Sequence, residues 1–242
     1  MFPFRDHNPS EKTPYVTIGL IAVNILLFLA TLGDGPGGMP LLWWNLALIP
    51  GMVMQGEHVW GLVTHMFLHG GFMHILGNML FLWIFGDNLE ERLGHIGFLV
   101  FYLVCGLVAA GAQMLAAPYE MIPMVGASGA VAGVMGGYLL LYPKAKIDVL
   151  FIFIVFFRVF SVPAWVMLGV WFVIQLFGGY SAVAGEGGVA YWAHAGGFVA
   201  GFALTLPVFL RLGGTAYWRR NDGHPPHPDA DYTRSRIPTV RR

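Results

Sequence analysis

The run Gly126-Ala127-Ser128-Gly129 places one hydroxyl among small residues, at the point where an apolar segment begins. A serine in the first turn of a helix also lies in the positive field of the helix dipole. Its hydroxyl becomes a useful nucleophile when a base accepts its proton, and His194, in the last apolar segment, is the candidate base. Runs of small residues also serve helix packing in membranes, so the motif alone leaves a packing role open.

His74 and Asn78 are the candidate donors for the oxyanion that such a reaction would form. They are four residues apart and therefore share one helix face. Together with the Ser128 backbone N–H, they could stabilise the developing charge. The usual third member of a serine triad is a carboxylate, but the nearby carboxylates all lie in predicted loops. We therefore expect a Ser–His dyad that has no carboxylate and needs no cofactor.

His65 and His69 have a spacing that could bind zinc. In the metalloprotease motif a Glu follows the first His, whereas Met66 follows His65 here. We therefore favour interfacial or loop contacts for these two histidines and expect no metal site.

The composition predicts a helical membrane protein that crosses the bilayer several times. Of the 242 residues, 57% are hydrophobic and 11% are charged, whereas soluble domains carry about 25% charged residues. The mean hydropathy is +0.66. The formal net charge of zero gives no broad basic surface for nucleic acid. The single cysteine, Cys105, lies in an apolar run and is interpreted as a packing residue.

We predict an all-α bundle of six transmembrane helices. Between the first two helices, residues 33–70 form a long external loop with short helices partly embedded in the outer leaflet. Residues 147–160 are apolar but are cut off by a proline, and we interpret them as re-entrant or interfacial. The domains are then a cytoplasmic segment (1–14), the membrane domain (15–210) and an Arg-rich, disordered tail (211–242). The six expected spans cover about residues 15–32, 71–85, 96–117, 128–142, 164–177 and 189–210.

The 13 lysines and arginines all lie in the N-terminal segment, the second-to-third and fourth-to-fifth connections, and the tail. The positive-inside rule therefore predicts that both termini are cytoplasmic. We expect a multi-pass protein of a prokaryotic cytoplasmic membrane, with the bilayer as its environment. With this topology Asn78, Ser128 and His194 all fall in the outer half of the bilayer. Polar residues at that depth are typical of functional sites.

Glycines explain how Ser128 and His194 could meet. Gly197 and Gly201 form a Gly-x-x-x-Gly face that also carries His194, and Gly129 and Gly133 offer a similar face on the fourth span. Such faces let two helix backbones approach closely. The fourth span is also short, so the loop before it must dip inward and needs a water-filled cavity.

These residues resemble the rhomboid family of intramembrane serine proteases over about residues 60–204. The matching motifs are His69-x4-His74-x3-Asn78, Gly86-x3-Glu90-x-Arg92, Gly126-Ala127-Ser128-Gly129 and Ala193-His194-x2-Gly197-x3-Gly201.

The resemblance implies that Ser128 is the nucleophile and that His194 is the general base and then the acid. It implies His74 and Asn78 as oxyanion donors with His69 nearby, and it gives Glu90 and Arg92 a structural role in a local polar network. The implied substrates are single-span membrane proteins cut near their outer boundary. Many members carry an aromatic residue four positions after the serine, where this chain has Ala132, so other residues must hold the imidazole.

Two other functions compete with a protease. A non-catalytic rhomboid-like protein would use the same bundle to bind client helices, although inactive relatives usually lose the nucleophile or the base. A small transporter or channel is the least favoured function, because the chain shows no repeat of the kind that inverted-topology transporters have.

Overall fold

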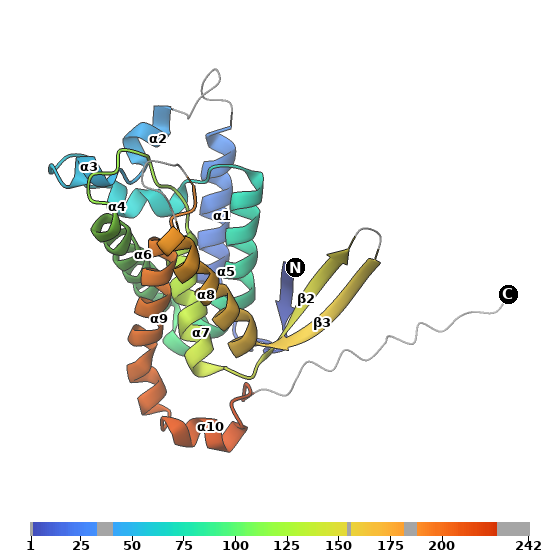
Figure 1. Ribbon diagram of the computed structural model, residues 1–242. Helices are drawn as coiled ribbons and strands as arrows, with labels where there is room; N and C mark the ends of the chain where they lie inside the picture. The colour runs from blue at the N-terminus through green and yellow to red at the C-terminus, as the bar shows by residue number, and fades with distance from the viewer. Residues whose placement is uncertain (1, 33–40, 154–155, 182–187, 227–242) are drawn as a thin grey trace.

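A computed structural model of the chain describes residues 2–32, 41–153, 156–181 and 188–226. Its body is a bundle of long apolar helices (Figure 1). Within the described residues the long helices are α1 (Tyr15–Ala30), α5 (Phe72–Leu93), α6 (His95–Ala116), α7 (Ser128–Leu141), α8 (Ala164–Ser181) and α9 (Tyr191–Arg211).

Three of these helices, α6, α8 and α9, are long and apolar enough to cross a membrane. A fourth span results if α5 is joined to the short helices before it, which meet it at an angle of 93°. The helices α1 and α7 are apolar but shorter, with 16 and 14 residues. The chain is therefore an integral membrane protein with three to four candidate spans, and the count of six stays a prediction.

The first long connection holds short helices, as the sequence predicts: α2 (Leu41–Leu46), α3 (Pro50–Val53), α4 (Gly61–Thr64) and the 3-10 helix η1 (His65–Phe67). Residues 33–40 of this connection lie outside the described residues. The connection pairs with the loop before α7, because Leu48 and Met124 exchange two backbone hydrogen bonds of 3.0 and 2.8 Å. The first long connection thus fixes the position of the loop that leads to Ser128.

A three-stranded antiparallel sheet corrects the all-α prediction. It consists of β1 (Phe2–Asp6), β2 (Lys146–Phe153) and β3 (Phe156–Pro163), in the order β1-β2-β3. Residues 147–153 and 156–160 therefore lie in the two strands of a hairpin, which the all-α prediction did not include, and their re-entrant or interfacial position stays a prediction. The physical reason for the strands is that valine, isoleucine and phenylalanine dominate this run and favour extended backbone.

Asp148 joins all three strands of the sheet. Its carboxylate accepts hydrogen bonds from Ser161 Oγ (2.6 Å) and Arg5 Nε (2.6 Å) and lies 3.0 Å from Nε2 of His7. Burial of Asp148 favours the neutral acid, but the hydrogen bonds from Ser161 and Arg5 outweigh this effect and lower its pKa. The N-terminal strand is therefore tied to the hairpin by charge as well as by its backbone.

Glu90 and Arg92, both on α5, fasten two different helices. Glu90 is buried and accepts hydrogen bonds from the backbone N–H groups of Val16 (2.8 Å) and Thr17 (2.7 Å) at the start of α1. Arg92 donates to the hydroxyl of Tyr142 (2.7 Å), directly after α7. The helix α5 is also longer than the predicted span, which ended near residue 85. Glu90 thus stabilises the contact of α5 with α1, and Arg92 stabilises its contact with the end of α7.

The helices α7 and α9 touch through their backbones. A methyl group at Gly197 would collide with the carbonyl group of Gly129, and one at Gly201 with the carbonyl group of Gly133. Only glycine allows this approach at these positions. The close contact that the glycine spacing predicts is confirmed.

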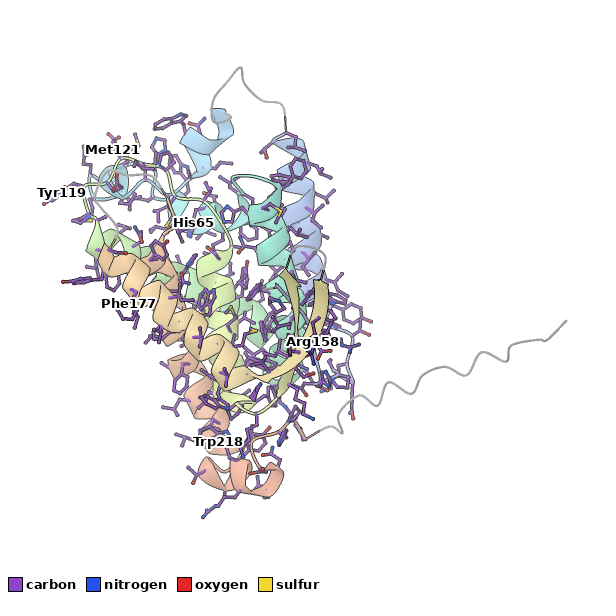
Figure 2. All side chains as sticks on the ribbon, turned by 45° about the vertical axis from the view of Figure 1, so that its right-hand side comes forward. His65, Tyr119, Met121, Arg158, Phe177 and Trp218 are labelled. Atoms are coloured by element: carbon purple, nitrogen blue, oxygen red, sulfur yellow. The ribbon has the colours of Figure 1, made fainter. Side chains whose placement is uncertain are left out.

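The tail begins with an ordered segment. Helix α10 (Thr215–Asn221) packs beneath the bundle, where Trp218 Nε1 donates to the carbonyl of Leu140 at 3.1 Å (Figure 2). The N–H of Lys144 also donates to the carbonyl of Gly223 at 2.9 Å. The disorder expected from residue 211 onward is therefore wrong for residues 211–226, and residues 227–242 lie outside the described residues.

Candidate active site

Three helix starts meet at the end of the bundle that lies away from α10 (Figure 1). Ser128 is the first residue of α7, His194 lies in the first turn of α9, and His74 and Asn78 lie in the first two turns of α5. The closely packed α7 and α9 supply the serine and the histidine, and α5 supplies the candidate donors. Side chains that are far apart in the sequence therefore come together in one small region of the bundle.

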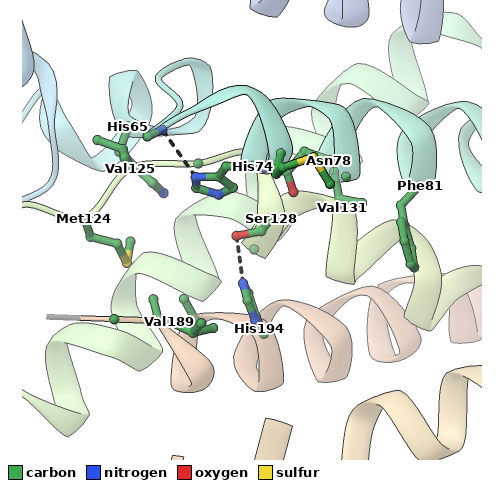
Figure 3. Close-up of a pocket in the computed structure, with 18 of the residues that line it drawn as sticks. His65, His74, Asn78, Phe81, Met124, Val125, Ser128, Val131, Val189 and His194 are labelled. Carbon is green, nitrogen blue, oxygen red and sulfur yellow. Dashed lines mark hydrogen bonds between the residues drawn. The ribbon is translucent and has the colours of Figure 1, made fainter. Parts of the chain in front are cut away.

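Ser128 and His194 are joined by a hydrogen bond. The Ser128 Oγ lies 2.8 Å from Nε2 of His194 (Figure 3). Both side chains are half-buried. This distance suits transfer of the hydroxyl proton to the imidazole. The juxtaposition that the sequence predicts for these two side chains is observed.

His74 is oriented to donate toward the serine. The N–H of Gly70 donates to Nδ1 of His74 at 3.3 Å. A nitrogen that accepts carries no hydrogen, so Nε2 is the protonated nitrogen of this neutral ring. A methyl group at Gly126 would lie 2.6 Å from His74 Nε2 and 3.5 Å from Ser128 Oγ. The donor and the nucleophile thus lie on either side of Gly126, and Figure 3 shows His74 and Ser128 next to each other in the pocket.

Asn78 adds a second donor to this region. Its side chain is buried, and its Nδ2 atom has no hydrogen-bond acceptor within the described residues. A buried amide N–H without an acceptor costs free energy. An oxyanion formed at Ser128 would supply the acceptor that is missing.

His65 and His69 hold the loop before Ser128. The carbonyl of His65 accepts from the N–H of Gly126 at 2.9 Å, and its ring Nδ1 lies 2.8 Å from the carbonyl of Gly61. Nε2 of His69 accepts from the N–H of Ala127 at 3.5 Å. The rings of His69 and His74 also lie edge to face, with centroids 5.2 Å apart. His69 therefore lies near the candidate donors, as the resemblance implies.

A cavity of about 530 Å³ surrounds these groups. Ser128, His194, His74 and Asn78 all line it, and its walls are mainly apolar side chains. Such a volume suits a short peptide segment or a small ligand. Its position at the start of α7 matches the cavity that the short fourth span predicts.

Gln175 is the site residue that the sequence analysis missed. Its Oε1 lies 2.8 Å from Nδ1 of His194, on the side of the ring opposite Ser128. The indole of Trp171, one turn earlier on α8, lies beside the same imidazole with ring centroids 5.8 Å apart. Gln175 is the sole amide, hydroxyl or charged side chain within 164–177, and the cost of polar groups in a membrane could have drawn attention to it.

Much of the chain is similar in sequence to known proteins. The model of the Rhomboid domain matches residues 56–211. RHOMBOID-like protein 4 of Arabidopsis thaliana is 31% identical over 72% of this chain and 41% of its own length. Rhomboid protease GluP of Bacillus subtilis is 35% identical over 52% of this chain and 24% of its own length. Rhomboid protease GlpG of Yersinia enterocolitica is 27% identical over 79% of this chain and 61% of its own length. The chain thus spans less than two thirds of each of these relatives.

Proposed function

The chain belongs to the rhomboid family, and from this premise we propose that it is an intramembrane serine endopeptidase. Its substrates would be single-span membrane proteins, cut at a peptide bond in or near the transmembrane segment. The observation that supports this proposal most directly is the 2.8 Å hydrogen bond between Ser128 Oγ and His194 Nε2. Two relatives that carry the name rhomboid protease support the same reaction class.

In the first half of the reaction, Ser128 Oγ attacks the carbonyl carbon of the scissile bond while His194 Nε2 takes the hydroxyl proton. The tetrahedral intermediate then collapses, and the C–N bond breaks. His194 returns its proton to the leaving amine. The products of this half are a free amine fragment and an ester between the other fragment and Ser128.

In the second half, a water molecule enters the cavity and gives a proton to His194 as its oxygen attacks the ester. The C–O bond to Ser128 breaks, and the proton returns to Ser128 Oγ. Water must therefore reach a site flanked by apolar helices. The polar groups that line the cavity would support that water.

The oxyanion of each tetrahedral intermediate needs hydrogen-bond donors. His74 Nε2–H, Asn78 Nδ2–H and the N–H of Ser128 are the proposed donors. The first N–H groups of a helix have no acceptor within the helix, so the Ser128 N–H is free for this role. Loss of one such donor typically reduces kcat by about 10²- to 10³-fold.

We propose that six helices cross the bilayer and that both termini face the cytoplasm. Within the described residues, the four segments that carry lysines and arginines meet at one end of the bundle: β1 pairs with β2, Lys144 binds the end of the tail helix, and Arg92 binds Tyr142. This clustering supports the orientation that the positive-inside rule predicts. The prokaryotic membrane stays a prediction, because the relatives come from plants as well as bacteria.

The test is cleavage of a reporter transmembrane segment by the purified protein in proteoliposomes. Ser128→Ala and His194→Ala should abolish cleavage, whereas Ser181→Ala on the exposed face of α8 should not. A serine-directed fluorophosphonate should label the wild type and fail to label Ser128→Ala. Equal cleavage by the wild type and Ser128→Ala would refute the proposal. If the folded wild type neither cleaves nor reacts but retains the reporter, the non-catalytic binding alternative is correct.

A further inference from the structure

We propose that Gln175 is a positioning residue that fixes the tautomer and orientation of His194 from α8. The inference rests on the proposed function, because it concerns the base of the proposed dyad. It replaces the two-residue site of the sequence analysis with a chain of three side chains: Ser128, His194 and Gln175. The third member is an amide where serine proteases usually have a carboxylate.

The two ring nitrogens of His194 have different partners. Nε2 lies 2.8 Å from Ser128 Oγ, and Nδ1 lies 2.8 Å from Gln175 Oε1. To accept the serine proton, Nε2 must hold a lone pair, so the ring hydrogen must be on Nδ1. A hydrogen on Nδ1 needs an acceptor, and an amide oxygen is an acceptor only. Gln175 therefore selects the tautomer that the reaction requires.

A second hydrogen bond sets the direction of the Gln175 amide. Its Nε2 atom donates to the carbonyl of Trp171 at 3.2 Å, one turn earlier on the same helix. That carbonyl can only accept, so a flipped amide would place two oxygens against each other. The backbone of α8 thus keeps the amide oxygen directed at His194.

Gln175 lies on the buried face of α8, next to residues that are exposed. Its side chain is 6% exposed, whereas the neighbouring Ile174 and Phe177 are 56% and 71% exposed. Figure 2 shows Phe177 on the outer side of α8. A buried polar side chain is costly in an apolar setting unless its hydrogen bonds are made. The hydrogen bond between Gln175 and the imidazole of His194 therefore offsets the cost of burying the amide on this face of α8.

Trp171 completes the support of His194. Its ring is tilted by 35° to the imidazole at a centroid distance of 5.8 Å. On α7, the residue one turn after Ser128 is Ala132, whose methyl group is too small to orient the imidazole. In this chain the orienting groups lie on α8 instead, one turn apart on the same inward face.

An amide differs from a carboxylate in charge. Gln175 can orient His194, but it adds no negative charge to stabilise the imidazolium that forms during the reaction. Loss of the amide should therefore impair catalysis without abolishing it. Orienting partners of metal-binding histidines contribute about 10- to 100-fold, and by analogy we expect a loss of kcat in this range for Gln175→Leu, with KM little changed.

The experiment compares Gln175→Leu and Gln175→Glu with the wild type, and Gln55→Leu, in the first external loop, serves as the matched control. Gln175→Glu keeps an acceptor and adds a charge, so it should retain more activity than Gln175→Leu. Its carboxylate would stabilise the protonated imidazole, so the acidic limb of the pH–kcat profile should move to higher pH. A merely structural role would lower the melting temperature and kcat of both variants without moving this limb.

A readout that does not depend on activity is the ¹⁵N spectrum of the histidine rings, with the His194 signal assigned by its loss in His194→Ala. The wild type should show Nδ1 protonated, and Gln175→Leu should show a mixture of tautomers. Unchanged kcat and an unchanged ¹⁵N spectrum in folded Gln175→Leu would overturn the inference while Ser128→Ala stays inactive. If the wild type itself neither cleaves nor reacts with fluorophosphonate, the proposed function fails instead, and the spectrum still decides the role of Gln175.

Discussion

Replacing Gly201 by alanine tests whether the contact between α7 and α9 sets the geometry of the site. A methyl group at this position would lie 2.5 Å from the Cα of Gly133 and still closer to its carbonyl group. Non-bonded carbon atoms are at optimal separation at about 3.5–4.0 Å. The obstruction is backbone, so no side chain can rotate to relieve it. The two helices must separate by about 1 Å.

The displacement would be carried to His194, which lies two turns earlier on α9. An increase of about 1 Å in the 2.8 Å distance to Ser128 Oγ would break that hydrogen bond. Misplacement of a catalytic group by about 1 Å can cost about 10²-fold in rate. Overpacking itself destabilises by about 1–3 kcal/mol. We therefore expect kcat/KM to fall about 100-fold and the melting temperature to fall.

The assay is reporter cleavage in proteoliposomes, together with thermal unfolding in detergent. Gly169→Ala on α8 is the matched control, because a methyl group there would meet no atom within 4 Å. Alanine is favoured over glycine inside a helix by about 0.5–1 kcal/mol, so the control should be as active as the wild type and slightly more stable. If Gly201→Ala behaves like Gly169→Ala, the backbone contact does not control the site.

Three further predictions concern the site and the sheet. Gly126→Ala should abolish cleavage and fluorophosphonate labelling, because residue 126 has a φ of +129° and its new methyl would lie 2.6 Å from His74 Nε2; retained labelling would contradict this. Asn78→Ala should lower kcat by about 10²- to 10³-fold with KM unchanged, and a change confined to KM in steady-state kinetics would assign it to binding instead. Burial raises the pKa of Asp6 from its ordinary 3.8 to about 7, although Tyr138 donates to it. Between these values the unfolded chain loses the proton first, so the contribution of Asp6 to stability should fall as pH rises from about 4 to 7, by at most about 4 kcal/mol; it is measured as the difference between the wild type and Asp6→Asn. Burial also raises the pKa of Asp87 to about 8, so Asp6→Asn should reduce the pH dependence without removing it, and a dependence unchanged in the variant would refute the reasoning.

The helices could be predicted because their apolar runs are long. The all-α prediction missed the strands β2 and β3 because an apolar run does not by itself distinguish strand from other buried structure. Valine, isoleucine and phenylalanine are concentrated there, and this is a strand signal. The partner strand is Phe2–Asp6, far away in the sequence, and no local pattern identifies such a distant pairing.

The candidate site could be predicted in part, since Ser128, His194 and their glycine faces carry short-range signals. Gln175 could not be found by a search for a carboxylate, because an amide serves as the partner of His194. Its contact depends on the rotation of α8 about its own axis. That rotation follows from packing against α9 and not from the α8 sequence alone.

The pairing of β1 with the hairpin has a consequence for the order in which the chain assembles. Arg5 and its partner Asp148 are separated by 143 residues. At a synthesis rate of about 5–20 residues per second, the first strand must wait on the order of 7–29 seconds for its partner to be synthesised. By then α1, α5, α6 and α7 have all been made, so the first strand can pair with the hairpin only after these helices have been synthesised.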